Sequence, residues 1–153
     1  MKTNLRLIKI LVLCVAIVVV TRVVEAQQVI VDHSSKFDEF SGSNWESAMG
    51  RLDNFALDMR NNPHMVGVLI VCGGQGRRRG EARTWTGCLK SYLVTRRGIE
   101  PNRILMINGG YREDLTVELW ETADRKRISN PEPHVKPKDV RFRNGKVKRL
   151  CEI

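Results

Sequence analysis

A run of arginines inside a glycine-rich segment is the part of the chain whose residue types best suit ligand binding. Residues 73–80 read Gly-Gly-Gln-Gly-Arg-Arg-Arg-Gly and follow an apolar run. Glycines between a strand and a helix let backbone amides come close to an anion, and the start of a helix carries partial positive charge. Arg77, Arg78 and Arg79, with Arg83 shortly after them, add full charges. This arginine loop (residues 73–80) predicts an anion site; the other interpretation, which suits most runs of arginine, is a solvated surface.

The remaining polar residues do not form a recognisable catalytic set. The spacing Gly74-x-Gly76-x-x-x-Gly80 is too weak to predict dinucleotide binding, because a full helix precedes the strand and no acidic residue closes a second strand. His33, His64 and His134 are far apart in the sequence, and no neighbour is placed to orient them. No cysteine pair has the spacing of a structural zinc site. We therefore expect a non-catalytic protein with no cofactor and no bound metal.

The first 26 residues have the three parts of a cleavable signal peptide. Basic residues come first, an apolar run over residues 10–20 follows, and Val24-Glu25-Ala26 offers a cleavage site. The apolar run is shorter than the ~20 residues of a membrane-spanning helix. We expect export, cleavage after Ala26, no membrane span in the mature chain, and a periplasmic or secreted location, with association with the outer membrane left open. An uncleaved signal anchor is the alternative.

An exported chain can form a disulfide, and the mature chain would keep three cysteines, Cys72, Cys88 and Cys151. Cys72 ends an expected strand, and Cys88 lies on the inward face of the helix that should pack back over that strand. We therefore predict a Cys72–Cys88 disulfide and an unpaired thiol at Cys151. Two buried thiols, which behave as small apolar side chains, are the alternative.

Two stretches with apolar residues at helical spacing flank the arginine loop. Residues 45–59 present one apolar face after a Ser43-x-x-Glu46 capping box. Asn62-Pro63 ends this helix, because the residue before a proline avoids the helical conformation. Residues 82–93 present a second apolar face, and Gly98 suits the left-handed residue that follows a helix. The arginine loop should therefore lead directly into the second helix.

Strands are expected before, between and after these helices, at residues 29–31, 66–72, 103–107 and 116–120. Residues 108–114 would join the last two as a hairpin connection. Right-handed crossovers between parallel strands place both helices on one face of the sheet. Residues 27–121 are therefore predicted to form an α/β (α+β) two-layer sandwich of order β-α-β-α-β-β.

The chain changes character beyond this domain. Residues 122–138 contain three prolines and are typical of a linker. In residues 139–153 the dipeptide Asn144-Gly145 stands between strand-like runs, which predicts a β-hairpin with Phe142 opposite Val147. Because an isolated hairpin is marginal in water, it must dock on the domain, pair with an edge strand or stay largely unfolded. From residue 121 onward, ten residues are basic and five are acidic. This basic tail would either attract an acidic partner or keep the protein soluble.

From Phe37 to Trp120 the order of short motifs resembles the OmpA-like C-terminal domain. The shared motifs are Asn62-Pro63, the strand and glycine turn at 68–74, Ser91-Tyr92-Leu93, Gly98-Ile99, Arg103-Ile104 and the turn at 109–113. The resemblance implies the sandwich described above and a cell-envelope setting. It also implies peptidoglycan binding, since members of this family hold diaminopimelate with an Asp after the glycine turn and an Arg early in the second helix. Here Gly76 and Trp85 stand at those two places.

We therefore expect an exported, non-catalytic cell-envelope module that binds an anionic ligand, such as a cell-wall glycan or a lipid head group. The expected ligand-binding residues are Arg77, Arg78, Arg79, Arg83 and Arg112. Nucleic acid is not an expected partner, and the oligomeric state is left open. One alternative is a secreted structural or interaction protein that acts through its basic tail. Another is a divergent peptidoglycan-binding protein.

Overall fold

The computed structural model describes residues 34–125, 131–147 and 149–151. All of them belong to one compact unit, Asp32–Ile153. The expected signal peptide at 1–26, its cleavage site and the expected strand at 29–31 lie outside the described residues. Within the described part of the chain, no helix is both long enough and apolar enough to cross a membrane.

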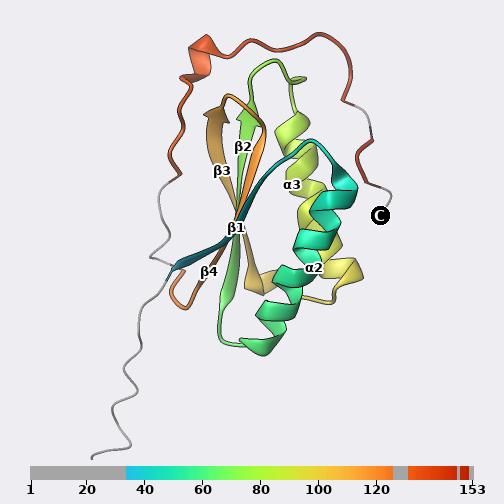
Figure 1. Cartoon of the computed structure of the whole chain (residues 1–153), viewed down its shortest axis with the longest axis vertical. Coiled ribbons are helices and arrows are strands. Elements are labelled where there is room, and N and C mark those ends of the chain that lie inside the picture. Colours follow the sequence, from blue (N-terminus) through green and yellow to red (C-terminus); the bar gives the residue numbers. More distant parts are fainter. Residues whose placement is uncertain (1–33, 126–130, 148, 152–153) are drawn as a thin grey trace, which may run out of the picture. The chain divides into compact units, whose positions relative to one another are not determined.

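A four-stranded mixed sheet of order β1-β4-β2-β3 is the base of the fold (Figure 1). Its strands are β1 (Ser35–Ser41), β2 (Val66–Gly74), β3 (Ile104–Arg112) and β4 (Thr116–Thr122). β2 and β3 are parallel, whereas β4 runs antiparallel to both β1 and β2. The element order β-α-β-α-β-β agrees with the expectation, except that its first strand, Ser35–Ser41, was not predicted. However, β4 lies between β1 and β2, so those two strands do not pair with each other.

Two helices, α2 (Trp45–Asn61) and α3 (Glu81–Ser91), cover the same face of the sheet (Figure 1). A π-helical turn at Tyr92–Arg96 extends α3, and short 3₁₀ turns lie at Pro101–Arg103 and Pro137–Asp139. The core between helices and sheet includes Leu52, Phe55, Leu69, Trp85, Leu89 and Leu119, each almost fully buried. Burial of side chains of this size contributes roughly 1.5–3 kcal/mol each. The expected two-layer arrangement of sheet and helices is therefore present.

The start of α2 differs from the expectation, and its end agrees with it. The cap is Asn44 and not Ser43: its side-chain oxygen accepts hydrogen bonds from the amides of Glu46 and Ser47, at 2.9 and 3.3 Å. An Asn at this position satisfies two amides that the helix itself leaves without partners. The helix ends at Asn61, two residues before Pro63, as the proline rule predicts.

One arginine joins the end of α2 to the start of β3. The Arg103 guanidinium donates hydrogen bonds to the carbonyls of Met59, Asn62 and Met65, at 2.6 to 3.1 Å. These carbonyls lie in the last turn of α2 and in the loop that follows it, where helical partners are missing. The positive charge also suits the carboxyl end of the helix. Arg103 therefore has a structural role.

The predicted hairpin between the last two strands is wrong. β3 continues to Arg112, and β3 and β4 lie on opposite sides of β2. The short connection therefore crosses the end of β2, where the amide of Gln75 donates to the carbonyls of Arg112 and Glu113 at 3.2 and 2.9 Å. A side chain at Gly74 would collide with the backbone of Asp114 and Leu115. Glycine at position 74 is therefore what lets the connection pass so close.

The predicted C-terminal hairpin is also wrong, because the described residues 139–147 and 149–151 contain no strand. Residues 131–147 and 149–151, here called the strap, instead dock on the domain. Tyr111 pairs with Val135, and Arg78 forms a bridge with Arg143. Figure 1 shows the strap crossing the end of the sheet where β2 and β3 terminate. An isolated hairpin is marginal in water. The tail therefore forms its hydrogen bonds with backbone groups of the sheet edge and the arginine loop, and not within itself.

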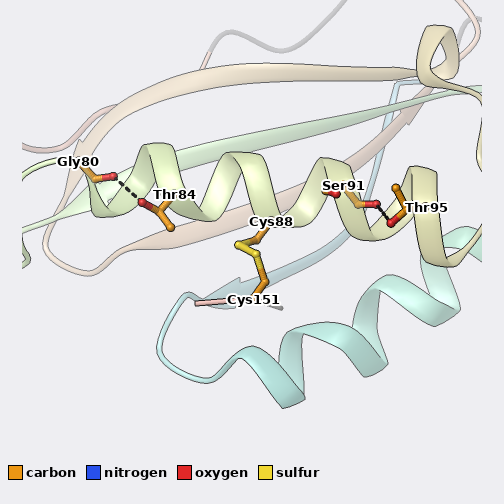
Figure 2. Close-up of a disulfide and its surroundings, with 6 residues drawn as sticks. All are labelled: Gly80, Thr84, Cys88, Ser91, Thr95 and Cys151. Atoms are coloured by element: carbon orange, nitrogen blue, oxygen red, sulfur yellow. Dashed lines mark hydrogen bonds between the residues drawn. A yellow bond between two sulfur atoms is a disulfide. The ribbon is translucent and has the colours of Figure 1, made fainter. Parts of the chain in front are cut away.

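The disulfide joins Cys88 to Cys151, with Cα atoms 5.8 Å apart, so the predicted Cys72–Cys88 pair is wrong. Side chains alternate between the two faces of a strand. Val71 packs in the core beneath the helices, whereas Cys72 belongs to a separate cluster with Val68 and Ile70. Cys72 therefore lies across the sheet from α3 and remains a free, buried thiol. Figure 2 shows the bond from the last turn of α3 to the end of the strap.

Candidate functional site

A cavity of about 400 Å³ lies where β2 and β3 end and α3 begins. Arg77, Arg78, Arg79 and Arg83 all line it, together with the first residues of α3. The location follows from the fold: in a β-α-β unit the crossover helix starts at the carboxyl end of the first strand, beside the carboxyl end of the second. Four of the five predicted ligand-binding arginines therefore surround one cavity.

A β-bulge in β3 shapes the side of the cavity opposite α3. Val71 pairs with Asn108 and Gly73 pairs with Tyr111, so β3 has one residue more than β2 over this stretch. Gly110 takes the left-handed conformation, with φ of 75°, and its amide donates to the Asn108 side chain at 3.0 Å. Bulges change the direction of the following side chain. Tyr111 lines the cavity just after this bulge.

The strap supplies a second aromatic side chain. Phe142 lines the cavity beside Tyr111, with the ring centroids 5.9 Å apart and the planes at 72°. The backbone next to Phe142 is held on the arginine loop by two hydrogen bonds of 2.9 Å, from Gly76 to the carbonyl of Arg141 and from Arg143 to the carbonyl of Arg77. The strap is therefore part of the cavity wall.

Glu81 offsets part of the positive charge of the loop. Its carboxylate accepts a hydrogen bond from the Arg77 side chain at 3.2 Å and another from the Arg78 backbone amide at 3.1 Å. An acidic residue in the first turn of a helix also interacts favourably with the helix dipole. Arg77 is therefore held by the protein's own carboxylate.

The other arginines of the cavity are not neutralised in this way. Across the described residues, no carboxylate oxygen lies within 4.0 Å of the guanidinium nitrogens of Arg78, Arg79 or Arg83. The Arg79 guanidinium lies over the Phe142 ring, 4.6 Å from its centroid, which holds the charge in place without cancelling it. Three positive charges therefore face one cavity without carboxylate partners.

The side chain of Arg78 adds a buried donor. Its Nε atom is buried and has no hydrogen-bond partner among the described residues. Leaving a buried polar donor unpaired costs about 1–3 kcal/mol, and more for a charged group. Arg78 also lines a smaller hollow of about 190 Å³ beneath Val147 and Leu150 of the strap. An acceptor that reached Nε would remove this cost.

The fifth predicted arginine, Arg112, does not line the cavity. Its guanidinium donates to Glu39 at 2.9 Å and to Glu118 at 2.5 Å. The Glu118 carboxyl is buried, which by itself raises its pKa, but hydrogen bonds from Trp120 and Arg112 and the charges of Arg112 and Lys36 outweigh burial and lower the pKa. The charge of Arg112 is therefore balanced by carboxylates from β1 and β4, and not by its neighbours in sequence.

Sequence reasoning missed the two aromatic residues of the cavity, Tyr111 and Phe142. Tyr111 falls in the stretch 108–114, which the sequence predicts to be a hairpin connection, although the Asn-Gly-Gly sequence before it also suits a bulge. Phe142 was placed in the hairpin. An apolar Leu150 next to Cys151 was the available signal that the tail docks on the domain, and Leu150 does pack against the core.

Within the described part of the chain, no group of three or more His, Cys, Asp and Glu side chains could hold a metal ion. Comparisons of the chain with protein-family models, with curated proteins and with solved structures return no match. The geometry and charge of the cavity alone therefore carry the functional conclusion.

Proposed function

We propose that this chain is an exported, non-catalytic cell-envelope module that binds an anionic ligand in the arginine-lined cavity. The observation that carries the proposal is a set of three arginines, Arg78, Arg79 and Arg83, that line one cavity and whose guanidinium groups have no carboxylate partner among the described residues. Guanidinium groups offer several N–H donors in a fork that matches carboxylate, phosphate or sulfate. The start of α3 at the same place favours the same charge.

Two further features support the envelope setting. The Cys88–Cys151 disulfide is of a kind that forms and persists in an oxidising compartment. The element order and the two helices on one face agree with what the resemblance to the OmpA-like C-terminal domain implies. Membership of that family remains part of the proposal.

The ligand is not held in the manner that the resemblance implies for peptidoglycan. Gly76 has no side chain, and Trp85, at the place of the expected Arg, is 1% exposed in the core. Neither residue can pair with the charges of diaminopimelate. Each lost charge-assisted hydrogen bond weakens binding by roughly 1.5–3 kcal/mol, so the cavity arginines would have to supply the affinity.

The test is co-sedimentation of the mature chain, residues 27–153, with isolated sacculi and, separately, with phosphatidylglycerol vesicles. The two arms distinguish a cell-wall anion from a lipid phosphate. We expect binding in one arm that falls steeply between about 0.1 and 1 M salt, since the Debye length shrinks from about 10 to about 3 Å. Arg79→Ala/Arg83→Ala should weaken it by about a hundredfold, because two charge-assisted contacts are lost.

The matched control is Lys90→Ala/Arg96→Ala, which removes the same charge from exposed positions on α3 and its π-helical extension. It should leave binding within about twofold, since exposed charges outside the site contribute little. Binding that survives high salt, or that both double variants weaken equally, would refute an anion site at this cavity.

The alternative, a protein that acts through its basic tail, rests on a different surface. Exposed basic residues follow one another along the strap at Lys136, Lys138, Arg141, Arg143 and Lys146. Lys136→Ala/Lys138→Ala would weaken binding to an acidic partner in that case and leave the cavity intact. The same variant should have little effect if the cavity holds the ligand.

A further inference from the structure

The cavity has two chemically different parts, and this narrows the ligand class of the proposed site. We infer that it takes a small two-part ligand: an aromatic body that carries one carboxylate, phosphate or sulfate group. The inference rests on the proposed function, since the anionic group is the part that the arginines bind. The aromatic body is the new element.

The first part of the cavity is apolar. Val71 and Met106 line it from β2 and β3, and Ala82 adds a methyl group from α3. An inorganic anion in this space would leave these side chains against water. The volume of about 400 Å³ lies within the range of about 300–1,000 Å³ that is usual for small-molecule sites. The cavity is therefore larger and more apolar than a bare anion needs.

The apolar part of the cavity also has an aromatic wall, made by residues that are distant in sequence. Tyr111 comes from the bulge of β3 and Phe142 from the strap, and their rings meet edge to face. A flat apolar ring packs favourably against such a pair. Arg79 lies over Phe142, so the faces of its guanidinium are used for stacking while its edge keeps N–H donors for a ligand.

The polar part of the cavity lies at the start of α3. Arg78 and Arg83 line the cavity together with Gly80 and Ala82. A ligand with an anionic group here and a ring against Tyr111 would use both parts at once. A neutral aromatic molecule would leave the guanidinium groups without an acceptor. The combination therefore points to an aromatic carboxylate, or to a phosphate or sulfate ester of an aromatic alcohol.

The experiment is calorimetric titration of the full chain, in an amine buffer, with phenyl phosphate, inorganic phosphate and phenol. Phenyl phosphate should bind about 10- to 100-fold more tightly than inorganic phosphate, because the ring moves out of water. The affinity for phenyl phosphate should exceed that for phenol by a similar factor, because phenol lacks the anionic group. Arg79→Ala/Arg83→Ala should weaken both phosphates, and Lys90→Ala/Arg96→Ala neither.

Phe142→Leu separates the aromatic contribution from the charge. Loss of the Arg79–Phe142 stacking affects both phosphates alike. The ratio of the affinity for phenyl phosphate to that for inorganic phosphate should therefore fall by about fivefold or more, since stacked ring pairs are worth about 0.5–1.5 kcal/mol beyond area, or about 2- to 12-fold, and the flat contact is lost as well. Tyr111→Leu tests the other wall residue if the strap variant folds poorly.

The outcomes separate this inference from the proposed function. Equal affinity for phenyl phosphate and inorganic phosphate would refute the two-part ligand and leave the anion site standing. Failure of both phosphates to bind, or phenol binding as tightly as phenyl phosphate, would overturn the proposed function and this inference with it.

Discussion

Removing the Cys88–Cys151 bond should destabilise the protein and loosen the strap that carries Phe142. The two cysteines are 63 residues apart in sequence. In the chain-entropy model, closing a loop of that length in the unfolded state is worth about 4 kcal/mol. That is a large share of the ~5–15 kcal/mol of a typical domain. We therefore expect Cys88→Ala/Cys151→Ala to lose up to about 4 kcal/mol in the free energy of unfolding.

The assay is urea denaturation of the full chain with and without a thiol reductant. Reductant should bring the parent protein close to the double variant and should not affect that variant. Cys72→Ala is the matched control: it leaves the bond in place, costs about 1 kcal/mol for a small cavity, and stays sensitive to reductant. A double variant that reductant still destabilises, or a Cys72→Ala variant insensitive to reductant, would show that the pairing is wrong. Proteolytic fragments linked through Cys88 and Cys151 would identify the bond directly.

Two further predictions concern buried charge and helix ends. Burial, together with a hydrogen bond that the protonated Glu121 donates to Asp58 and repulsion by the Asp58 charge, raises the pKa of Glu121 from 4.5 to about 7. The unfolded chain therefore loses this proton first as the pH rises, and the free energy of unfolding should fall by up to about 3 kcal/mol from about pH 4.5 to about pH 7. Glu121→Gln should flatten this fall in urea denaturation, and an unchanged slope would contradict the assignment. Arg103→Ala should lower the free energy of unfolding by about 2–4 kcal/mol, because three carbonyls lose a charged donor. Arg103→Lys should recover part of this loss. A loss below about 0.5 kcal/mol for Arg103→Ala in thermal denaturation would exclude the structural role of Arg103.

The helices and the central strands could be predicted from sequence because their signals are local. Apolar spacing identified α2, α3 and the apolar centre of β2, and Asn62-Pro63 marked the end of α2. β1 was missed, since Ser35–Ser41 is mostly polar and exposed and is a strand only because β4 pairs with it. The local sequence of a segment does not show which distant strand will pair with it.

In the candidate site, too, the residues that are adjacent in the chain could be predicted, and those that come together from distant segments could not. The sequence alone identified the arginine loop and Arg83 as the residues suited to an anion, because glycine, arginine and a following helix are adjacent in the chain. It could not show that Arg112 is balanced by Glu39 and Glu118, since those carboxylates come from other strands. It also could not show that Phe142 would form part of the cavity wall.

What the sequence determined by itself was therefore the set of local elements and the run of charge at the start of α3. The tertiary structure alone decided which face of the sheet each strand residue occupies, and with it the choice of Cys88–Cys151 over Cys72–Cys88. It also decided that the tail docks as a strap. The physical reason is that strand pairing, the face that a residue occupies and the docking of the tail depend on contacts between residues far apart in the chain. The alternatives differ in the free energy of the whole fold, and a short stretch of sequence does not contain that information.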